Sequence, residues 1–196
     1  MKHNGFEYVD LGLPSGTKWA TCNIGAISET DNGLYFPFGG IVGLDSPYYE
    51  GNFDSHKLKF NGDKKATLHL DNDAAHIHMG GKWHMPTKEQ FEELLDEKNT
   101  VSTWIYDYCI REVSGRLFRS RINNETLFIP ANGFISNHQY VQNGQTCSLW
   151  TSSLDFSSVY NCTDFFCDKY NTYLARTSAY YVCIGIRGVF NTFWIK

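Results

Sequence analysis

Leu149 to Arg187 reads LWTSSLDFSSVYNCTDFFCDKYNTYLARTSAYYVCIGIR and is the most informative part of the sequence. Its ends look rigid, with a Trp followed by small hydroxyl residues at one end and Ile-Gly-Ile-Arg at the other. Residues 155–185 between them are rich in Tyr, Phe, Ser, Asn, Asp, Thr and Cys. They contain no Glu, Gln, Trp or Met and a single Lys, Lys169. Those five types form about one residue in five of ordinary chains, so about six would be expected.

Composition alone leaves two interpretations of residues 155–185 open. Tyr combined with small polar residues is typical of antibody paratopes, because Tyr supplies a large contact area at low entropy cost. A Tyr-rich β segment inside a core has a similar composition, because strands also favour aromatic and β-branched residues.

The whole chain has the composition of a globular protein. Its 196 residues, 42% of them hydrophobic, are enough for one domain with a sizeable core. The net charge is -4 and no basic stripe is present, so we expect no nucleic-acid partner. No apolar run approaches the length of a membrane span, and the N-terminus lacks the apolar core of a signal peptide.

The six cysteines predict thiols and not a disulfide scaffold. None forms a C-x-x-C pair, and their spacing does not fit a zinc ribbon. Three of them, Cys162, Cys167 and Cys183, lie in the unusual stretch, where disulfide bonding does not explain them.

Two helices are expected. Thr87 to Lys98 is the clearest element, since Thr87 and Gln90 form a capping box and apolar residues recur at helical spacing. Asp71 to Met79 fits a short helix with Asp71 as its N-cap, ending at a pair of glycines.

Most other segments have strand patterns. Glu7 to Ala20 predicts strand, tight turn and strand. After Asn99 an antiparallel meander is expected, with turns at Ser114-Gly115 and Asn123-Asn124, and Asn143-Gly144 is a hairpin signal. Residues 44–67 are expected to be a surface loop, and Val189 to Lys196 a last strand. The meander strands are expected at Ser102 to Cys109, Ile110 to Ser114, Leu117 to Ile122 and Glu125 to Ile129.

The chain is therefore predicted to be α+β, with mostly short antiparallel strands and one or two helices. No internal repeat and no linker divides it, so residues 1–196 are expected to form a single domain.

Several blocks of the sequence resemble the Fibrobacter-type major paralogous domain, a family abundant in Bacteroidetes. The blocks keep the family's order and spacing over nearly the whole chain. They are EYVDLGLPSGTKWATCNIGA at 7–26, DAAH at 73–76, GGKWHMPT at 80–87, FIPANG at 128–133, LWTSS at 149–153 and Ile186-Arg187. The family is similar to C-type-lectin-fold proteins, including formylglycine-generating enzymes and the variable proteins of diversity-generating retroelements. The resemblance thus implies a C-type-lectin-like fold.

The sequence departs from the family at four places. His84 stands where the family usually has Arg, Met79 where it often has Trp, and Gly188 where Pro is common. Residues 160–181 match poorly, and they coincide with the unusual composition.

The resemblance also implies a mechanism for that composition. In retroelement-diversified proteins, adenines of a template repeat are randomised, and an AAY codon cannot become Lys, Glu, Gln, Trp or Met. Residues 155–185 contain only permitted types, apart from Lys169. Cysteine is a permitted type, so diversification would also account for the three cysteines of this stretch.

The sequence contains candidate residues for an enzyme and for a metal site. Formylglycine-generating enzymes need a copper-binding cysteine pair, and here Cys162 with Cys167, or Cys167 with Cys183, are candidates by count only. No catalytic residues and no cofactor are therefore predicted.

His76, His78 and His84 invite a zinc interpretation, but the helix puts the first two on different sides and no fourth ligand is evident. No metal site is predicted.

The favoured hypothesis is a ligand-binding protein of receptor or adhesin type whose hypervariable surface, residues 155–185, is diversified by a retroelement. The alternative is a non-diversified surface domain of the same family with a structural or fixed-ligand role, and a formylglycine-generating-type oxidase is third. The partner would be a protein or glycan on another cell or particle surface, and oligomers are possible. We expect a phage virion or bacterial cell surface as the location.

The candidate ligand-binding residues are Phe156, Tyr160, Asn161, Asp164, Phe165, Tyr170, Asn171, Tyr173, Arg176, Tyr180 and Tyr181. Because successive strand residues point to opposite faces, about half of the aromatic ones should point inward.

Overall fold

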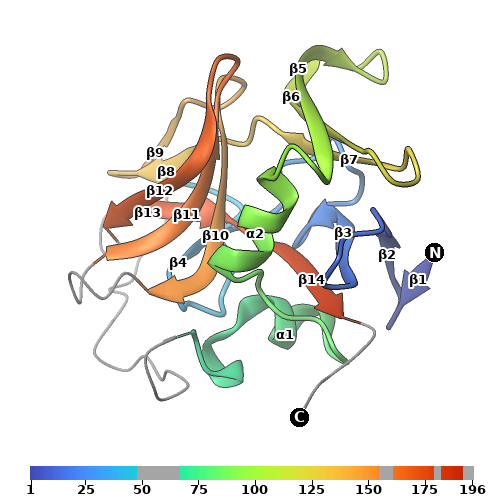
Figure 1. The fold of residues 1–196 in the computed structure, drawn as a ribbon. Helices are drawn as coiled ribbons and strands as arrows, with labels where there is room; N and C mark the ends of the chain where they lie inside the picture. The colour runs from blue at the N-terminus through green and yellow to red at the C-terminus, as the bar shows by residue number, and fades with distance from the viewer. Residues whose placement is uncertain (48–66, 155–160, 179–181, 192–196) are drawn as a thin grey trace.

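A computed structural model describes residues 1–47, 67–154, 161–178 and 182–191 (Figure 1). Within these ranges the chain forms mostly β-strands, together with two α-helices and a 3-10 turn. The predicted α+β class is confirmed at this level. The expected loop over residues 44–67 and the end of the expected last strand fall largely outside the described residues.

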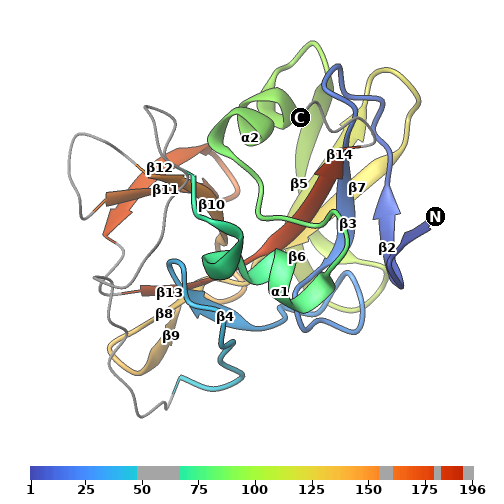
Figure 2. The same cartoon turned by 90° about the horizontal axis from the view of Figure 1, so that it is seen from below.

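The first sheet joins the two ends of the chain. Its strand order is β1-β2-β3-β14, and all its pairs are antiparallel. The predicted strand, turn and strand near the N-terminus are β2 and β3. Figure 2 shows β14 running beside β3, where Val189 pairs with Trp19. The bounds are β1 Lys2–His3, β2 Phe6–Val9, β3 Thr17–Asn23 and β14 Arg187–Asn191.

The second sheet contains the stretch from Leu149 onward. Its order is β12-β11-β10-β13-β8-β9, and β4 also pairs with β13. The β10–β13 pair is parallel, while the other pairs are antiparallel. The bounds are β4 Tyr35–Pro37, β8 Phe134–Ser136, β9 Gln139–Val141, β10 Cys147–Leu154, β11 Asn161–Cys167, β12 Thr172–Ser178 and β13 Val182–Gly185. Asn143-Gly144 lies between β9 and β10, which do not pair with each other, so the predicted hairpin there is wrong.

The predicted meander is present, but with three strands and not four. They are β5 Thr100–Tyr108, β6 Val113–Ser120 and β7 Thr126–Pro130. The turn expected at Ser114-Gly115 is wrong, because both residues lie inside β6. A side chain at Gly115 would come within 2.3 Å of the Ile129 carbonyl oxygen, so this glycine permits close strand packing and does not mark a turn.

The two helices begin at side-chain caps. α2 spans Lys88–Leu95 and has the predicted capping box: Gln90 N–H donates to Thr87 Oγ1, and Thr87 N–H donates to Gln90 Oε1. α1 spans Ala74–Met79, and its cap is Asp73, which accepts from His76 N–H. The predicted cap Asp71 is therefore wrong; it lies in the preceding 3-10 turn, η2 Leu70–Asn72.

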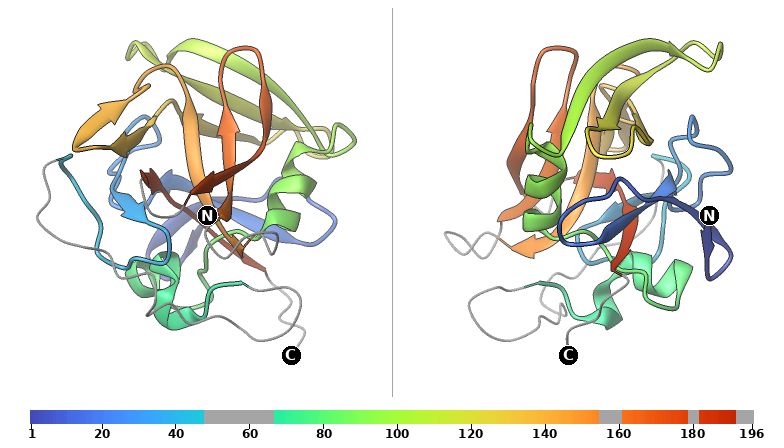
Figure 3. Two further views of the ribbon diagram at one scale, coloured as in Figure 1. Left: turned by 90° about the vertical axis from the view of Figure 1, so that its left-hand side faces the viewer. Right: turned by 45° about the vertical axis from the view of Figure 1, so that its right-hand side comes forward.

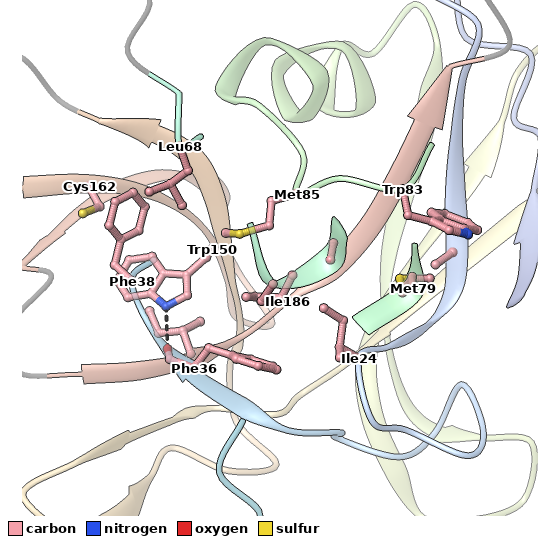
Figure 4. Close-up of a cluster of buried hydrophobic side chains, with 14 of the residues drawn as sticks. Ile24, Phe36, Phe38, Leu68, Met79, Trp83, Met85, Trp150, Cys162 and Ile186 are labelled. Carbon is pink, nitrogen blue, oxygen red and sulfur yellow. Dashed lines mark hydrogen bonds between the residues drawn. The ribbon is translucent and has the colours of Figure 1, made fainter. Parts of the chain in front are cut away.

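Two large hydrophobic clusters form the core. One surrounds Trp150 and includes Phe36, Phe38 and Trp83, as Figure 4 shows. The Trp150 indole N–H donates to the Phe36 carbonyl at 2.8 Å, so this large ring is buried with its polar atom satisfied. The other cluster packs α2, the meander and β10 together around Trp19. Burying each large side chain stabilises the fold by about 1.5–3 kcal/mol.

Candidate functional site

The β11–β12 hairpin carries the described part of the predicted binding segment. The two strands pair continuously from Asn161–Ser178 to Cys167–Thr172, and β12 is the edge strand of its sheet. The Asp168 carboxylate caps the turn, since its Oδ1 accepts from the backbone N–H of Tyr170 at 2.7 Å and of Asn171 at 2.6 Å. Slight burial acts to raise the pKa of Asp168, but these hydrogen bonds hold it below its usual value.

A buried arginine from the meander forms hydrogen bonds to the backbone of this turn. Arg116 of β6 donates through Nη2 to the Asp168 carbonyl at 2.6 Å and to the Asn171 carbonyl at 3.2 Å. Its guanidinium also lies 5.8 Å from the centre of the Trp104 ring. The tip of the hairpin is therefore fixed by two carbonyl contacts and a carboxylate cap, which makes it a rigid platform.

Three of the predicted contact residues lie exposed on this hairpin. Tyr170 and Asn171 lie in the turn, and Tyr173 is the second residue of the return strand β12; the two tyrosines are 78% and 48% exposed. Asn161 and Arg176 lie in β11 and β12, paired with Ser178 and Thr163. Four predicted residues lie outside the described residues: Phe156, Tyr160, Tyr180 and Tyr181.

Two of the predicted contact residues are buried, and their assignment to a binding surface is corrected. Phe165 stacks on Phe91 of α2 at a ring distance of 5.0 Å and is enclosed by the core. Asp164 lies on the other face of β11, opposite Trp150 and Ala175, and is also buried. Both lie in the middle of a three-strand region, where neighbouring side chains cover each face of the sheet.

Burial gives Asp164 an unusual electrostatic state. Desolvation raises the pKa of its carboxyl to about 6, and its hydrogen bond with Thr177 offsets only part of this effect. Among the described residues its Oδ1 has no hydrogen-bond partner. An aspartate in this position is costly to ionise, so it is a weak point of the hairpin and not a surface contact.

The cysteines of the unusual stretch have structural positions. None of the six cysteines, all within the described residues, forms a disulfide. Cys162, Cys167 and Cys183 are buried in three different hydrophobic clusters, where a thiol behaves as a small apolar side chain. This burial gives each of the three a packing role, and it places the members of both cysteine pairs named for copper in separate clusters. Cys167 instead lies opposite Cys147 across the β10–β11 ladder.

The hydroxyl residues after Trp150 tie the hairpin to α2. Thr151 Oγ1 donates to the Thr163 carbonyl at 2.6 Å, and Ser153 Oγ accepts from Lys88 N–H at 3.0 Å. Ser152 N–H donates to the Pro86 carbonyl at 2.8 Å. The small hydroxyl residues thus bond to β11 on one side and to Pro86 and the start of α2 on the other, which accounts for the rigid character predicted at this end.

At the other end of the stretch, Arg187 is completely buried. It donates to Asn23 Oδ1 at 2.8 Å and to the Ala20 and Thr21 carbonyls at 3.1 and 2.6 Å. Burial lowers the pKa of Arg187 to about 10, with partial compensation from Cys22, Glu29 and Cys147. The guanidinium stays charged at neutral pH and fixes the bulge where β14 meets β3.

An aromatic cleft that sequence reasoning missed lies beside the hairpin turn. Figure 3 shows the β11–β12 turn and the β5–β6 strands at the same end of the molecule. Between them is a cleft of about 380 Å³. The lining residues come from four separate segments, and only the alternation of Trp104 and Tyr106 in a strand could have indicated it. They are Trp104, Tyr106, Ser114, Gln142, Gly144, Gln145, Thr146, Asp168, Lys169 and Tyr170.

Met79, His84 and Gly188, the three single residues named as departures in the sequence analysis, lie together. A side chain on Gly188 would come within 2.5 Å of Met79 Sδ and 3.2 Å of the Trp83 ring. His84 exchanges two backbone hydrogen bonds with Val189, the residue after Gly188. The small residue at 188 and the methionine at 79 therefore fit one another at the junction of α1 and β14.

The histidines considered for zinc bond to separate carbonyl groups. His76 Nδ1 lies 3.3 Å from the Trp83 oxygen, His78 Nε2 2.8 Å from the Ile41 oxygen, and His84 Nδ1 2.9 Å from the Met85 oxygen. Within the described ranges, no group of three or more His, Cys, Asp or Glu side chains is arranged to hold a metal ion.

The helices in the described part of the chain are all too short or too polar to cross a membrane.

Comparisons with protein families, with curated proteins and with solved structures returned no match for this chain.

Proposed function

We propose that this protein is a ligand-binding protein of receptor or adhesin type, with a C-type-lectin-like fold and a surface in residues 155–185 that a retroelement diversifies. The observation that carries the proposal is the division within Leu149 to Arg187. A buried, hydrogen-bonded frame at Trp150–Ser153 and Ile184–Arg187 flanks a hairpin whose tip exposes tyrosine and asparagine.

Further features support the fold assignment. The N- and C-terminal strands β3 and β14 pair antiparallel, so both chain ends lie in one sheet. Two helices pack against the sheets, and residues 155–185 lie in one continuous run between β10 and β14. Such an arrangement suits a scaffold that tolerates changes in one segment while its ends stay fixed.

The exposed side chains support a binding role. Tyr170 on the preorganised turn and Tyr173 in the adjoining strand β12 are large amphipathic side chains, and such side chains dominate the energetics of many interfaces. The partner we propose is a protein or glycan on another cell or particle surface, with the protein located on a phage virion or bacterial cell surface.

The gene provides the test. We expect a near-copy of the 3′ end of the coding sequence close by, differing from it at adenines, together with a reverse-transcriptase gene. A locus with neither a template repeat nor a reverse transcriptase would falsify the diversification proposal.

A further inference from the structure

The geometry points to a specific ligand class for the cleft between β5–β6 and the β11–β12 turn: we propose that it binds a neutral saccharide. This inference rests on the proposed ligand-binding function and deepens it. It also makes residues outside 155–185 part of the binding site.

Aromatic rings line both sides of the cleft. Trp104 and Tyr106 alternate along β5 and so share one face of the strand, while Tyr170 contributes from the hairpin turn. Tyr106 is 65% exposed and Trp104 half-buried, so both rings are accessible to a ligand. Flat aromatic faces are suited to the apolar C–H face of a pyranose ring.

Neutral polar groups supply the remaining contacts. Gln142 and Gln145 provide side-chain amides at the rim. The Ser114 hydroxyl donates to the Tyr106 carbonyl at 3.3 Å and the Thr146 hydroxyl to Gln142 Oε1 at 3.4 Å, so these two hydroxyls offer a ligand acceptor oxygens only. A sugar presents hydroxyl groups that both donate and accept, so it can satisfy such a lining along its edges. A purely apolar ligand would desolvate the side-chain amides of Gln142 and Gln145 without giving them hydrogen bonds, which is costly.

The charged groups nearby are already engaged. The Asp168 carboxylate accepts backbone N–H bonds, and the Arg116 guanidinium donates to the Asp168 and Asn171 carbonyls. Lys169 is the one cation among the lining residues, and its ammonium lies 4.5 Å from the centre of the Tyr170 ring. The cleft therefore offers no converging cations for a phosphate, which favours a neutral ligand.

The volume agrees with a small saccharide unit. A cleft of about 380 Å³ lies in the lower part of the range of ligand pockets, which is roughly 300–1,000 Å³. A proline-rich peptide would also stack on aromatic rings, but it needs an extended groove and not a short concave site.

Binding can be measured by isothermal titration calorimetry with cellotriose, maltotriose, mannotriose and chitotriose. We expect saturable binding of at least one of them. Tyr106→Ala and Tyr170→Ala should each weaken that binding by about tenfold, because each removes one stacking ring. Tyr140→Ala, an exposed tyrosine outside the cleft, is the matched control and should bind as the unchanged protein does.

Fluorescence locates the ligand. Trp19, Trp83 and Trp150 are buried, so in a Trp194→Phe background Trp104 should be the residue whose emission changes on titration. A saccharide-dependent change that disappears in Trp104→Phe supports the site.

Three results would overturn the inference: no binding of any of the four saccharides, undiminished binding by Tyr106→Ala, or binding of a proline-rich peptide in their place. Failure of the saccharide inference can be distinguished from failure of the proposed ligand-binding function. If Tyr173→Ala abolishes recognition of a cell-surface partner while Tyr106→Ala does not, the hairpin binds its ligand elsewhere and only the cleft inference fails. Absence of the template repeat affects diversification alone.

Discussion

At the residue scale, Asp164 is the clearest case of a side chain whose chemistry depends on its position. Its pKa is raised from 3.8 to about 6 because burial disfavours the ionised form. The folded protein therefore holds this proton more tightly than the unfolded chain does. The stability that protonated Asp164 contributes is fully present below about pH 4, and it is lost as the pH rises through 6.

Replacing Asp164 with Asn removes this pH dependence. We expect Asp164→Asn to raise the free energy of unfolding by about 1–3 kcal/mol at pH 8, because one pKa unit corresponds to about 1.4 kcal/mol. At pH 4 the difference should nearly vanish. Urea denaturation at the two pH values measures both, and an equal difference at pH 4 and pH 8 would argue against a buried ionised Asp164.

Gly188 and Met79 provide a second prediction at this scale. Gly188→Ala would bring its new methyl group within 2.5 Å of Met79 Sδ, so we expect a loss of about 1–3 kcal/mol. Met79→Ala should cost about 2–5 kcal/mol through the cavity it leaves. In the double variant the alanine methyl occupies part of that cavity, so the two losses should not add. Additive losses in a denaturation cycle would show that the residues do not share this space.

The roles of residues whose partners are close in sequence can be predicted from the sequence. The roles of residues whose partners are distant in sequence cannot. The Thr87–Gln90 capping box was identified because both of its partners lie within one turn of chain. The cap Asp73 was missed in favour of Asp71, since both carboxylates precede the same helix; contact of Asp73 with Met85 N–H decides between them. Alternation indicates that half of a strand's residues point inward, but the β10–β11–β12 packing determines that Phe165 is one of them.

At the element scale, the β11–β12 hairpin depends on a neighbouring sheet. Arg116 reaches from β6 to two carbonyls of the hairpin turn, and hydrogen bonds to charged groups contribute about 1.5–3 kcal/mol. The meander therefore positions the part of the chain that we propose to bind ligands.

Arg116→Lys should loosen this turn, because lysine lacks the planar guanidinium that lies beside the Trp104 ring and holds Nη2 within reach of both carbonyls. We expect faster amide hydrogen exchange at residues 168–171 and a loss of stability of about 1–3 kcal/mol. Arg119→Lys, on the same strand but exposed, is the control and should change neither quantity. Unchanged exchange at the turn in Arg116→Lys would mean that the hairpin holds its shape alone.

Elements of the candidate site were predictable only in part. The sequence pattern predicts a binding segment at residues 155–185, and in the structure Tyr170 and Asn171 of the turn and Tyr173 of β12 are exposed. The sequence does not predict the cleft, because its walls come from residues 104–106, 114, 142–146 and 168–170, which lie together only after the sheets pack.

At the scale of the whole molecule, the core extends through the segment proposed to vary. Cys162, Cys167 and Cys183 are buried in it, as is Cys147. Variation in the segment must therefore leave these inward positions unchanged, because replacing them would create cavities or bury polar groups.

Thiol reactivity tests this arrangement. With a chromogenic disulfide reagent, the native protein should react rapidly at Cys109, which is exposed, and more slowly at Cys22, which is partly buried. The other four thiols should react only as fast as the protein opens globally. Rapid modification of all six without denaturant would contradict the burial of the hairpin's inner face.

Exposed positions of the hairpin should vary between cells while the buried frame stays constant. Sequencing the codons for residues 149–187 in many cells of one natural population tests this division most directly. We predict substitutions at Tyr170, Asn171 and Tyr173, drawn from the residue types that adenine changes permit, with Trp150, Phe165 and Arg187 constant. Identical sequences in every cell, or substitutions spread evenly over buried and exposed codons, would contradict the account.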